Sequence, residues 1–315
     1  MSFARARLAL GAALLAGVAL AAPLSPPVVA AQNAQDQRLP PVFDGAAALH
    51  HVERLVAIGP RPAGSPAAAR ARTYILDELK KAGVSAKVEA FDAVTPHGRL
   101  PMGNVLAVIP GRRPDVILIA GHYDTKWFRD ITFVGANDGG SSAGLLIEIA
   151  RRLRERPREY TYWVAWFDGE EARENWTATD SLYGSRRMAA ELGKSRRLPS
   201  AVIVADMIGD RDLGIRREAG STSWLTDVIW ASAARLGYVT QFMQDALAVE
   251  DDHAPFLRLG VPATLLIDFD FPPWHTAEDT LDKISATSLE IVGKVILDAL
   301  PAIEDGLNRS RSRKP

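Results

Sequence analysis

The chain has 315 residues, of which 47% are hydrophobic and 24% charged, a balance typical of a globular protein with a large core. The formal net charge of −1 gives no excess of basic residues, which argues against nucleic acid as a partner. Cysteine is absent, which excludes disulfide bonds, acylation of a cysteine and thiolate ligands. Any metal ion would therefore be held by His, Asp and Glu.

The N-terminal segment predicts export. Arg5 and Arg7 precede an uncharged apolar run over residues 8–22, and small residues at 29–31 suit cleavage, so we interpret 1–31 as a signal peptide. The apolar run is shorter than the ~20 residues that span a bilayer, which makes a retained anchor the weaker alternative. Residues 32–43 are rich in Pro, Gln and Ala and are interpreted as a linker. We expect a periplasmic or secreted protein without stable membrane insertion after cleavage.

The first expected elements of the domain are two helices and a hairpin. A helix capped by Asp44 is expected to run to about residue 58. Ser65, followed by a proline, marks the start of a second helix that ends at Gly83. An edge hairpin is expected next, with strands at 86–94 and 104–109.

From there on, buried strands alternate with helices. The expected strands are 116–120, 162–167, 201–205 and 263–267, and the expected helices are 141–154, 181–192, 221–236 and 285–299. This alternation predicts an α/β fold in which three layers, α/β/α, enclose a mostly parallel mixed central sheet. We place one domain at 44–305 and a frayed basic tail at 306–315. Ligands of such sheets bind beyond the carboxyl ends of the strands.

Polar residues gather at those strand ends. They are His122, Asp124, Asp138, Glu170, Glu171, Asp206 and His275. Each alone has an ordinary explanation as a loop, cap or surface residue. Together they would place several unpaired charges in one crevice, which is costly without a cation. Zinc is the cation that best suits mixed imidazole and carboxylate ligands.

Neighbouring residues suggest how this site is organised. Glu170 and Glu171 follow a strand, where adjacent side chains point in different directions, so one can bind a metal while the other transfers protons. Asp124 can hold the second nitrogen of His122 as a supporting partner. Asp279 can do the same for His275, or can cap the next helix.

In this order, the set from His122 to His275 resembles the M28 zinc aminopeptidases and their relatives, the animal-type glutaminyl cyclases, over about residues 45–300. Several segments resemble the cyclases more closely, above all 167–172 with Trp176 and 180–186, and 250–253 with 255–262. Two positions differ. The loop 137–140 is more similar to the aminopeptidases, and Leu265 stands where a cyclase pocket histidine is expected.

The cyclase resemblance implies a zinc-dependent glutaminyl-peptide cyclotransferase, which converts an N-terminal glutamine to pyroglutamate and releases ammonia. It implies one zinc ion and Glu170 as the group that moves protons. The expected substrates are peptide or protein N-termini, and we expect the enzyme to be a monomer. The other implied residues are the ligands Asp138, Glu171 and His275, the amine-positioning pair Asp206 and Asp251, and the pocket walls Trp176 and Trp274.

The aminopeptidase resemblance implies a different use of the same residues. His122 and Asp206 would hold a second zinc ion, Asp138 would bridge the two ions, and Glu170 would activate a water molecule. Inert receptor or scaffold domains with this fold are a third class. The loss of ligands or of the glutamate base would mark them, and this chain has lost neither.

Overall fold

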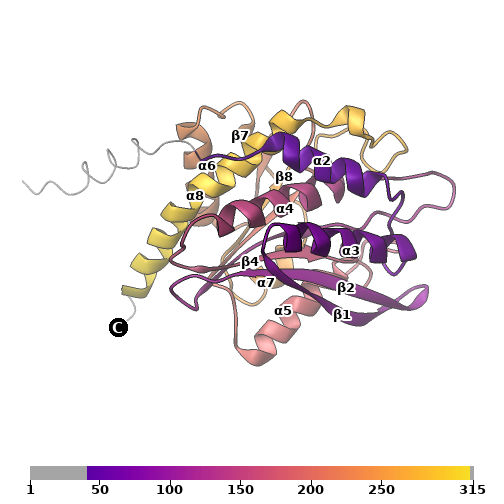
Figure 1. Cartoon of the computed structure of the whole chain (residues 1–315), viewed down its shortest axis with the longest axis horizontal. Coiled ribbons are helices and arrows are strands. Elements are labelled where there is room, and N and C mark those ends of the chain that lie inside the picture. The colour runs from indigo at the N-terminus through magenta and orange to yellow at the C-terminus, as the bar shows by residue number, and fades with distance from the viewer. Residues whose placement is uncertain (1–40, 313–315) are drawn as a thin grey trace, which may run out of the picture. The chain divides into compact units, whose positions relative to one another are not determined.

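The computed structural model describes residues 41–312, except for the side chain of Arg311 (Figure 1). The signal peptide expected at 1–31 and the linker up to residue 40 lie outside the described residues. Within the described part, no helix has both the length and the apolar character needed to cross a bilayer.

The centre of the fold is one eight-stranded sheet with the order β1-β2-β4-β3-β5-β8-β6-β7. Its strands are β1 (Ser85–Thr95), β2 (Gly98–Ile109), β3 (Val116–His122), β4 (Thr161–Phe167), β5 (Ala201–Asp206), β6 (Ile215–Glu218), β7 (Phe242–Leu247) and β8 (Ala263–Ile267). The four central strands β4, β3, β5 and β8 run parallel to one another. The β1–β2 hairpin joins β4 in antiparallel fashion, and β6 is antiparallel to β8. The expected mostly parallel mixed sheet is thus confirmed.

Helices cover both faces of this sheet. They are α2 (Gly45–Val56), α3 (Pro66–Lys81), α4 (Gly140–Arg154), α5 (Tyr183–Ser195), α6 (Ser223–Arg235), α7 (Ala254–Leu257) and α8 (Ala286–Ser312), with a 3₁₀ turn at Leu281–Lys283. Helices α2, α3, α4, α6 and α8 pack their buried apolar residues on one face, and α5 and α7 pack theirs on the other (Figure 1). The three-layer α/β/α prediction is therefore confirmed.

Local sequence signals explain the first helices. The Asp44 carboxylate accepts a hydrogen bond from the backbone N–H of Ala47 at 2.9 Å, as an N-cap does. Ser65 caps α3 in the same way through the N–H of Ala68 at 3.1 Å. Gly83 follows α3 with a φ of 68°, a conformation that glycine adopts without strain.

The structure differs from the sequence prediction in three short elements, β6, β7 and α7, and in the length of the last helix, α8. Strands β6 and β7 and the short helix α7 were not expected, because their sequences are short and polar or contain a proline. Helix α8 does not end near residue 299 but continues to Ser312, through much of the segment expected as a frayed tail. Ile303 and Leu307, four residues apart, are buried in the core and explain why the helix continues past Pro301.

Candidate metal centre and substrate pocket

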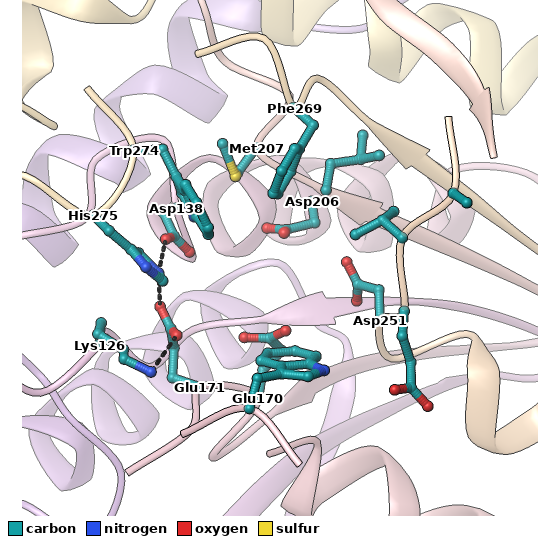
Figure 2. Close-up of a pocket in the computed structure, with 15 residues that line it drawn as sticks. Lys126, Asp138, Glu170, Glu171, Asp206, Met207, Asp251, Phe269, Trp274 and His275 are labelled. Atoms are coloured by element: carbon teal, nitrogen blue, oxygen red, sulfur yellow. Dashed lines mark hydrogen bonds and ion pairs between the residues drawn. The ribbon is translucent and has the colours of Figure 1, made fainter. Parts of the chain in front are cut away.

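The sheet topology brings the predicted polar residues to one edge. His122 and Asp206 are the last residues of the parallel strands β3 and β5. Glu170 and Glu171 follow β4, and His275 follows β8. Because the carboxyl ends of parallel strands meet at the same edge, side chains distant in sequence line one cavity there (Figure 2).

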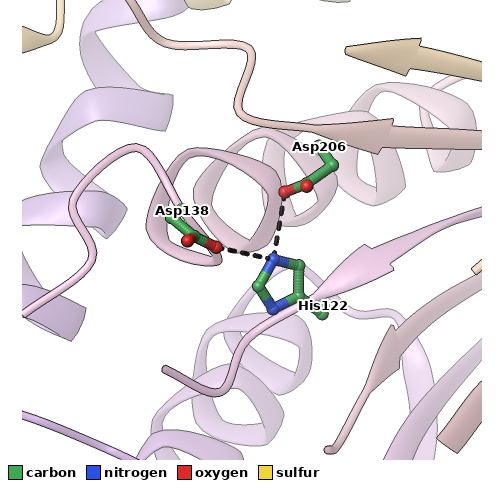
Figure 3. A group of neighbouring side chains, drawn as sticks. All are labelled: His122, Asp138 and Asp206. Atoms are coloured by element: carbon green, nitrogen blue, oxygen red, sulfur yellow. Dashed lines mark hydrogen bonds and ion pairs between the residues drawn. The ribbon is translucent and has the colours of Figure 1, made fainter. Parts of the chain in front are cut away.

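Two groups of possible metal ligands share Asp138. In the first group, Nε2 of His122 lies 3.2 Å from Oδ1 of Asp138 and 3.0 Å from Oδ1 of Asp206 (Figure 3). In the second group, Nε2 of His275 lies 3.3 Å from Oδ2 of Asp138 and 3.1 Å from Oε1 of Glu171 (Figure 2). The two Asp138 oxygens thus point to different histidines. Each group offers three ligand atoms within 4.8 Å of one another, and imidazole with carboxylate is a donor set that suits zinc.

The charges of the cavity call for a cation. Burial, followed by the charge of Asp138, raises the pKa of Glu171 to about 7. Burial and the charge of Asp206 likewise raise the pKa of Asp251 to about 7. The Lys126 ammonium lies 3.8 Å from Oε2 of Glu171 and offsets only part of this charge. Buried carboxylates without sufficient counter-charge are costly, so a divalent metal ion fits the residues present.

Glu170 differs from its neighbour Glu171. It is 6% exposed and lines the cavity, but it belongs to neither ligand group. Burial raises its pKa well above the ordinary value of a glutamate, against the opposing effect of His122. Figure 2 shows its carboxylate pointing into the space that Asp206 and Asp251 also face. The divergent directions expected for the two adjacent glutamates are present in the structure.

Asp124 and Asp279 support the two ligand loops. Oδ1 of Asp124 lies 3.5 Å from Nδ1 of His122 and accepts a hydrogen bond from the N–H of Glu170 at 3.1 Å. The Asp279 carboxylate accepts hydrogen bonds from the N–H groups of Asn137 and Asp138 at 2.7 and 3.0 Å. Asp279 therefore holds the loop of the shared ligand, instead of contacting His275 or capping a helix.

Sequence reasoning gave no role to the buried guanidinium of Arg61. It donates hydrogen bonds to the carbonyl oxygens of Tyr123, Val134 and Gly135 at 2.7, 2.5 and 2.8 Å. These bonds tie the segment after β3 to the loop that precedes Asp138. Arg61 is fully buried, so water cannot replace its side chain there. The sequence signal was an arginine in a Gly-Pro-Arg turn, far from the ligands along the chain.

The backbone has a positive φ at the possible ligand His275 and at Met207, the residue after Asp206. His275 itself has a φ of 56°, and Met207, directly after Asp206, has a φ of 50°. Non-glycine residues adopt this left-handed region at a cost and do so most often where function requires a particular geometry.

Aromatic side chains wall a cavity of about 560 Å³. Trp274 stacks on His275 with ring centroids 4.1 Å apart, and Phe269 lies 4.8 Å from Trp274 on its other side. Trp176 lines the cavity from the loop after β4, where it is 42% exposed. Both predicted tryptophans therefore line the cavity, whereas sequence reasoning missed Phe269 and Met207. Isolated aromatic and sulfur side chains in loops give no distinctive pattern.

The loop that carries Trp176 is fixed from within. Asp180 accepts hydrogen bonds from the backbone N–H groups of Arg173, Glu174 and Asn175 at 2.8, 2.9 and 3.0 Å. Such a cluster of bonds to one carboxylate holds an irregular loop in a defined conformation.

Leu265 and Asn137, the two positions at which the sequence differs from the cyclases, have structural roles here. Leu265 lies in β8, is fully buried and packs in the smaller core cluster on the α5 side of the sheet. Asn137 is also buried, and its Oδ1 accepts a hydrogen bond from the N–H of Gly209 at 2.7 Å.

Comparisons with known proteins agree with this geometry. The model of peptidase family M28 matches residues 104–300, and the chain belongs to this family. A bovine glutaminyl-peptide cyclotransferase is 27% identical over 74% of this chain and 75% of its own length. A bovine glutaminyl-peptide cyclotransferase-like protein is 30% identical over 75% of this chain and 70% of its own length.

Solved structures place the chain more closely. The crystal structure of a glutaminyl cyclase from an Acidobacteriales bacterium superposes with a TM-score of 0.80 and 44% identity, covering 85% of this chain and 97% of the other. Within family M28, the chain thus groups with the glutaminyl cyclases. A leucine aminopeptidase precursor from Bacteroides thetaiotaomicron shares the fold, with a TM-score of 0.77 at 23% identity over 83% of this chain and 98% of the other.

Proposed function

We propose that this chain is a zinc-dependent glutaminyl-peptide cyclotransferase that converts N-terminal glutamine to pyroglutamate and releases ammonia. One observation carries the proposal: Glu170 stands outside both ligand groups, yet it shares a cavity with Trp176, Trp274 and every member of those groups except His122. The 44% identity to a solved glutaminyl cyclase supports the same activity.

Asp138, Glu171 and His275 are the proposed ligands of the zinc ion. Three protein side chains are the usual number of ligands in catalytic zinc sites. A zinc ion held by these three would supply Lewis-acid polarisation of an amide carbonyl. Stacking of Trp274 on the His275 ring fixes the direction of that ring.

Glu170 is the proposed proton carrier. It takes the proton from the substrate α-amine and gives it to the departing ammonia, so that one carboxylate serves both steps. Burial raises its pKa, which makes the carboxylate a stronger base for taking up the amine proton. The hydrogen bond from the Glu170 N–H to Asp124 keeps this residue in place.

Asp206 and Asp251 are proposed to hold the amine. Their carboxylates face the same space as that of Glu170 (Figure 2), where a cationic or hydrogen-bonding amine is attracted. Trp176 and Trp274 are proposed to fold the glutamine side chain back towards its own amine. Bringing two reacting groups of one molecule together in this way accelerates a cyclisation strongly.

A di-zinc aminopeptidase remains the second candidate, because a specific observation favours it. His122 and Asp206 form a complete second ligand group with the other oxygen of Asp138. In that reading, Glu170 activates a water molecule for hydrolysis of the first peptide bond.

The setting of this activity is part of the proposal. The signal segment at 1–31 and the linker at 32–43 are proposed to deliver a monomeric catalytic domain, 44–305, to the periplasm or the medium. The substrates are then N-termini of exported peptides and proteins.

One experiment separates the two candidates. Purified protein is incubated with a glutaminyl peptide and with aminoacyl anilides, and ammonia and aniline are assayed separately while zinc is counted per chain. Ammonia and pyroglutamate with one zinc ion support the cyclase. Free amino acids and aniline with two zinc ions, and no pyroglutamate, move the assignment to the aminopeptidase.

A further inference from the structure

A buried hydrogen-bonded pair lies behind the cavity wall that carries Asp251. Glu218 is the last residue of β6 and is 6% exposed, and His253, two residues after Asp251, is 2% exposed. Nε2 of His253 lies 3.1 Å from Oε2 of Glu218. Neither side chain is among those that line the cavity, so the pair does not touch a substrate bound there.

Glu218 is a well-anchored acceptor. Its Oε1 accepts a hydrogen bond from the N–H of Gly220 at 2.8 Å, and its Oε2 accepts one from the Ser221 hydroxyl at 2.8 Å. The same hydroxyl oxygen accepts a bond from the N–H of Leu265 in β8. Burial acts to raise the pKa of Glu218, but the hydrogen bonds from His253, Gly220 and Ser221 outweigh it and lower the pKa to about 2. The carboxylate is therefore charged at neutral pH and fixed to the sheet.

The wall itself has few internal supports. Residues 248–251 line the cavity between the end of β7 and the start of α7. In the described part of the chain, the backbone of 248–250 takes part in no hydrogen bond. Before this segment, the N–H of Ala219 donates to the carbonyl of Leu247 at 2.8 Å. After it, Glu218 holds His253. Two adjacent residues, 218 and 219, thus hold both ends of the wall.

A tight turn links His253 to Asp251. The N–H of Ala254 donates to the carbonyl of Asp251 at 2.8 Å, and the N–H of Phe256 donates to the carbonyl of His253 at 3.1 Å. Because these bonds make the turn one unit, a shift of the His253 side chain moves the backbone that directs the Asp251 carboxylate. Displacements of about 1 Å cost up to about 10²-fold in rate when they affect a reacting geometry.

We propose that Glu218 and His253 are positioning residues that set the direction of the Asp251 carboxylate in the cavity. The kinetic consequence rests on the proposed cyclase function. The holding of the turn is a property of the folded chain and is tested without any substrate.

The structural test is hydrogen exchange of the backbone in segment 248–254 of the zinc-loaded protein. Glu218→Ala and His253→Ala should speed exchange there by about tenfold or more, because the wall loses a contact that holds one of its ends. His50→Ala is the matched control, since it removes an exposed His–Glu pair on α2, where Nδ1 of His50 lies 3.4 Å from Glu53. Wild-type exchange rates in both test variants would refute the proposal, whatever their activity.

The kinetic test is a double-mutant cycle on ammonia release from a glutaminyl peptide. Glu218→Ala should lower kcat by about 10- to 100-fold with zinc content unchanged. The same change in an Asp251→Ala background should cost almost nothing more, because the pair acts through Asp251. If the loss of kcat in the double variant equals the product of the losses in the two single variants, the positioning role is overturned.

A conservative variant protects both tests against failure to fold. Glu218→Gln keeps an oxygen that accepts from His253, and it should retain activity within about fivefold and exchange near the wild-type rate, which a loss of packing at this site would not explain. A wild-type protein that releases no ammonia refutes the proposed function, and the exchange result still decides whether the pair holds the turn.

Discussion

Trp274 lies nearly parallel to the imidazole of His275, with ring centroids 4.1 Å apart and an angle of 22° between the rings. One residue of this adjacent pair is a proposed zinc ligand and the other a wall of the cavity. The stack therefore joins the metal site to the surface that orients the substrate, and the two roles are separable by mutation.

Trp274→Ala is expected to keep zinc and to lose cyclisation. Zinc remains because the three proposed ligands Asp138, Glu171 and His275 are unchanged. The rate falls by about 10²-fold, because the glutamine side chain is no longer held against its amine. Zinc analysis and ammonia release are the two measurements. Loss of zinc from this variant would show that the stack serves the metal site instead.

His275→Ala and Glu171→Gln are expected to lower zinc content and activity together. Each change removes one of three proposed ligands from the group that includes Asp138. Elemental analysis after dialysis measures the loss. A chelator should inactivate the wild-type protein, and added zinc should restore it. Stoichiometric zinc in both variants would contradict the assigned ligand set.

Glu170→Gln is expected to keep zinc and to lower kcat by about 10²- to 10⁴-fold, the usual contribution of a positioned proton-transfer group. Glutamine has nearly the same size as glutamate, and the backbone N–H of residue 170 still donates a hydrogen bond to Asp124. Steady-state kinetics with parallel zinc analysis is the check. Activity within threefold of wild type would remove Glu170 from its proposed role.

Arg61→Met is expected to destabilise the folded state by about 2–4 kcal/mol, since it leaves three carbonyl groups, two of them buried, without their donor. Urea unfolding of the zinc-free protein measures this loss. Arg54→Met, at an exposed position of α2, is the control and should change the free energy of unfolding by less than about 0.5 kcal/mol. Equal free energies of unfolding of the two variants would show that other contacts hold the loop that precedes Asp138.

Export is expected to leave a mature protein that begins near Gln32. N-terminal sequencing of exported material measures the start. A Gln32 terminus is itself a possible substrate, and its cyclisation would appear in mass spectra as the loss of one ammonia. Material that starts at Met1 or Ser2 would contradict the signal-peptide interpretation.

The sequence predicted the central fold because its strands are buried on both faces and therefore appear as apolar runs, as in β3 and β5. It predicted that polar residues gather at one edge, because the carboxyl ends of parallel strands meet there. It did not predict β7, whose middle residues are exposed and polar, or the length of α8 beyond Pro301. The Glu218–His253 contact was equally invisible, because a pair 35 residues apart forms only once β6 and α7 are in place.

The position of Asp138 has a consequence for how activities diverge within family M28. Its two oxygens serve two histidines on opposite sides, and Ser142 holds Asp206 on one of those sides at 3.3 Å. Because both ligand groups are already present around this one carboxylate, a second metal ion would require no new backbone path in this chain. Cyclisation and hydrolysis would then share one scaffold and one shared carboxylate, and the difference between them would lie in the cavity around it.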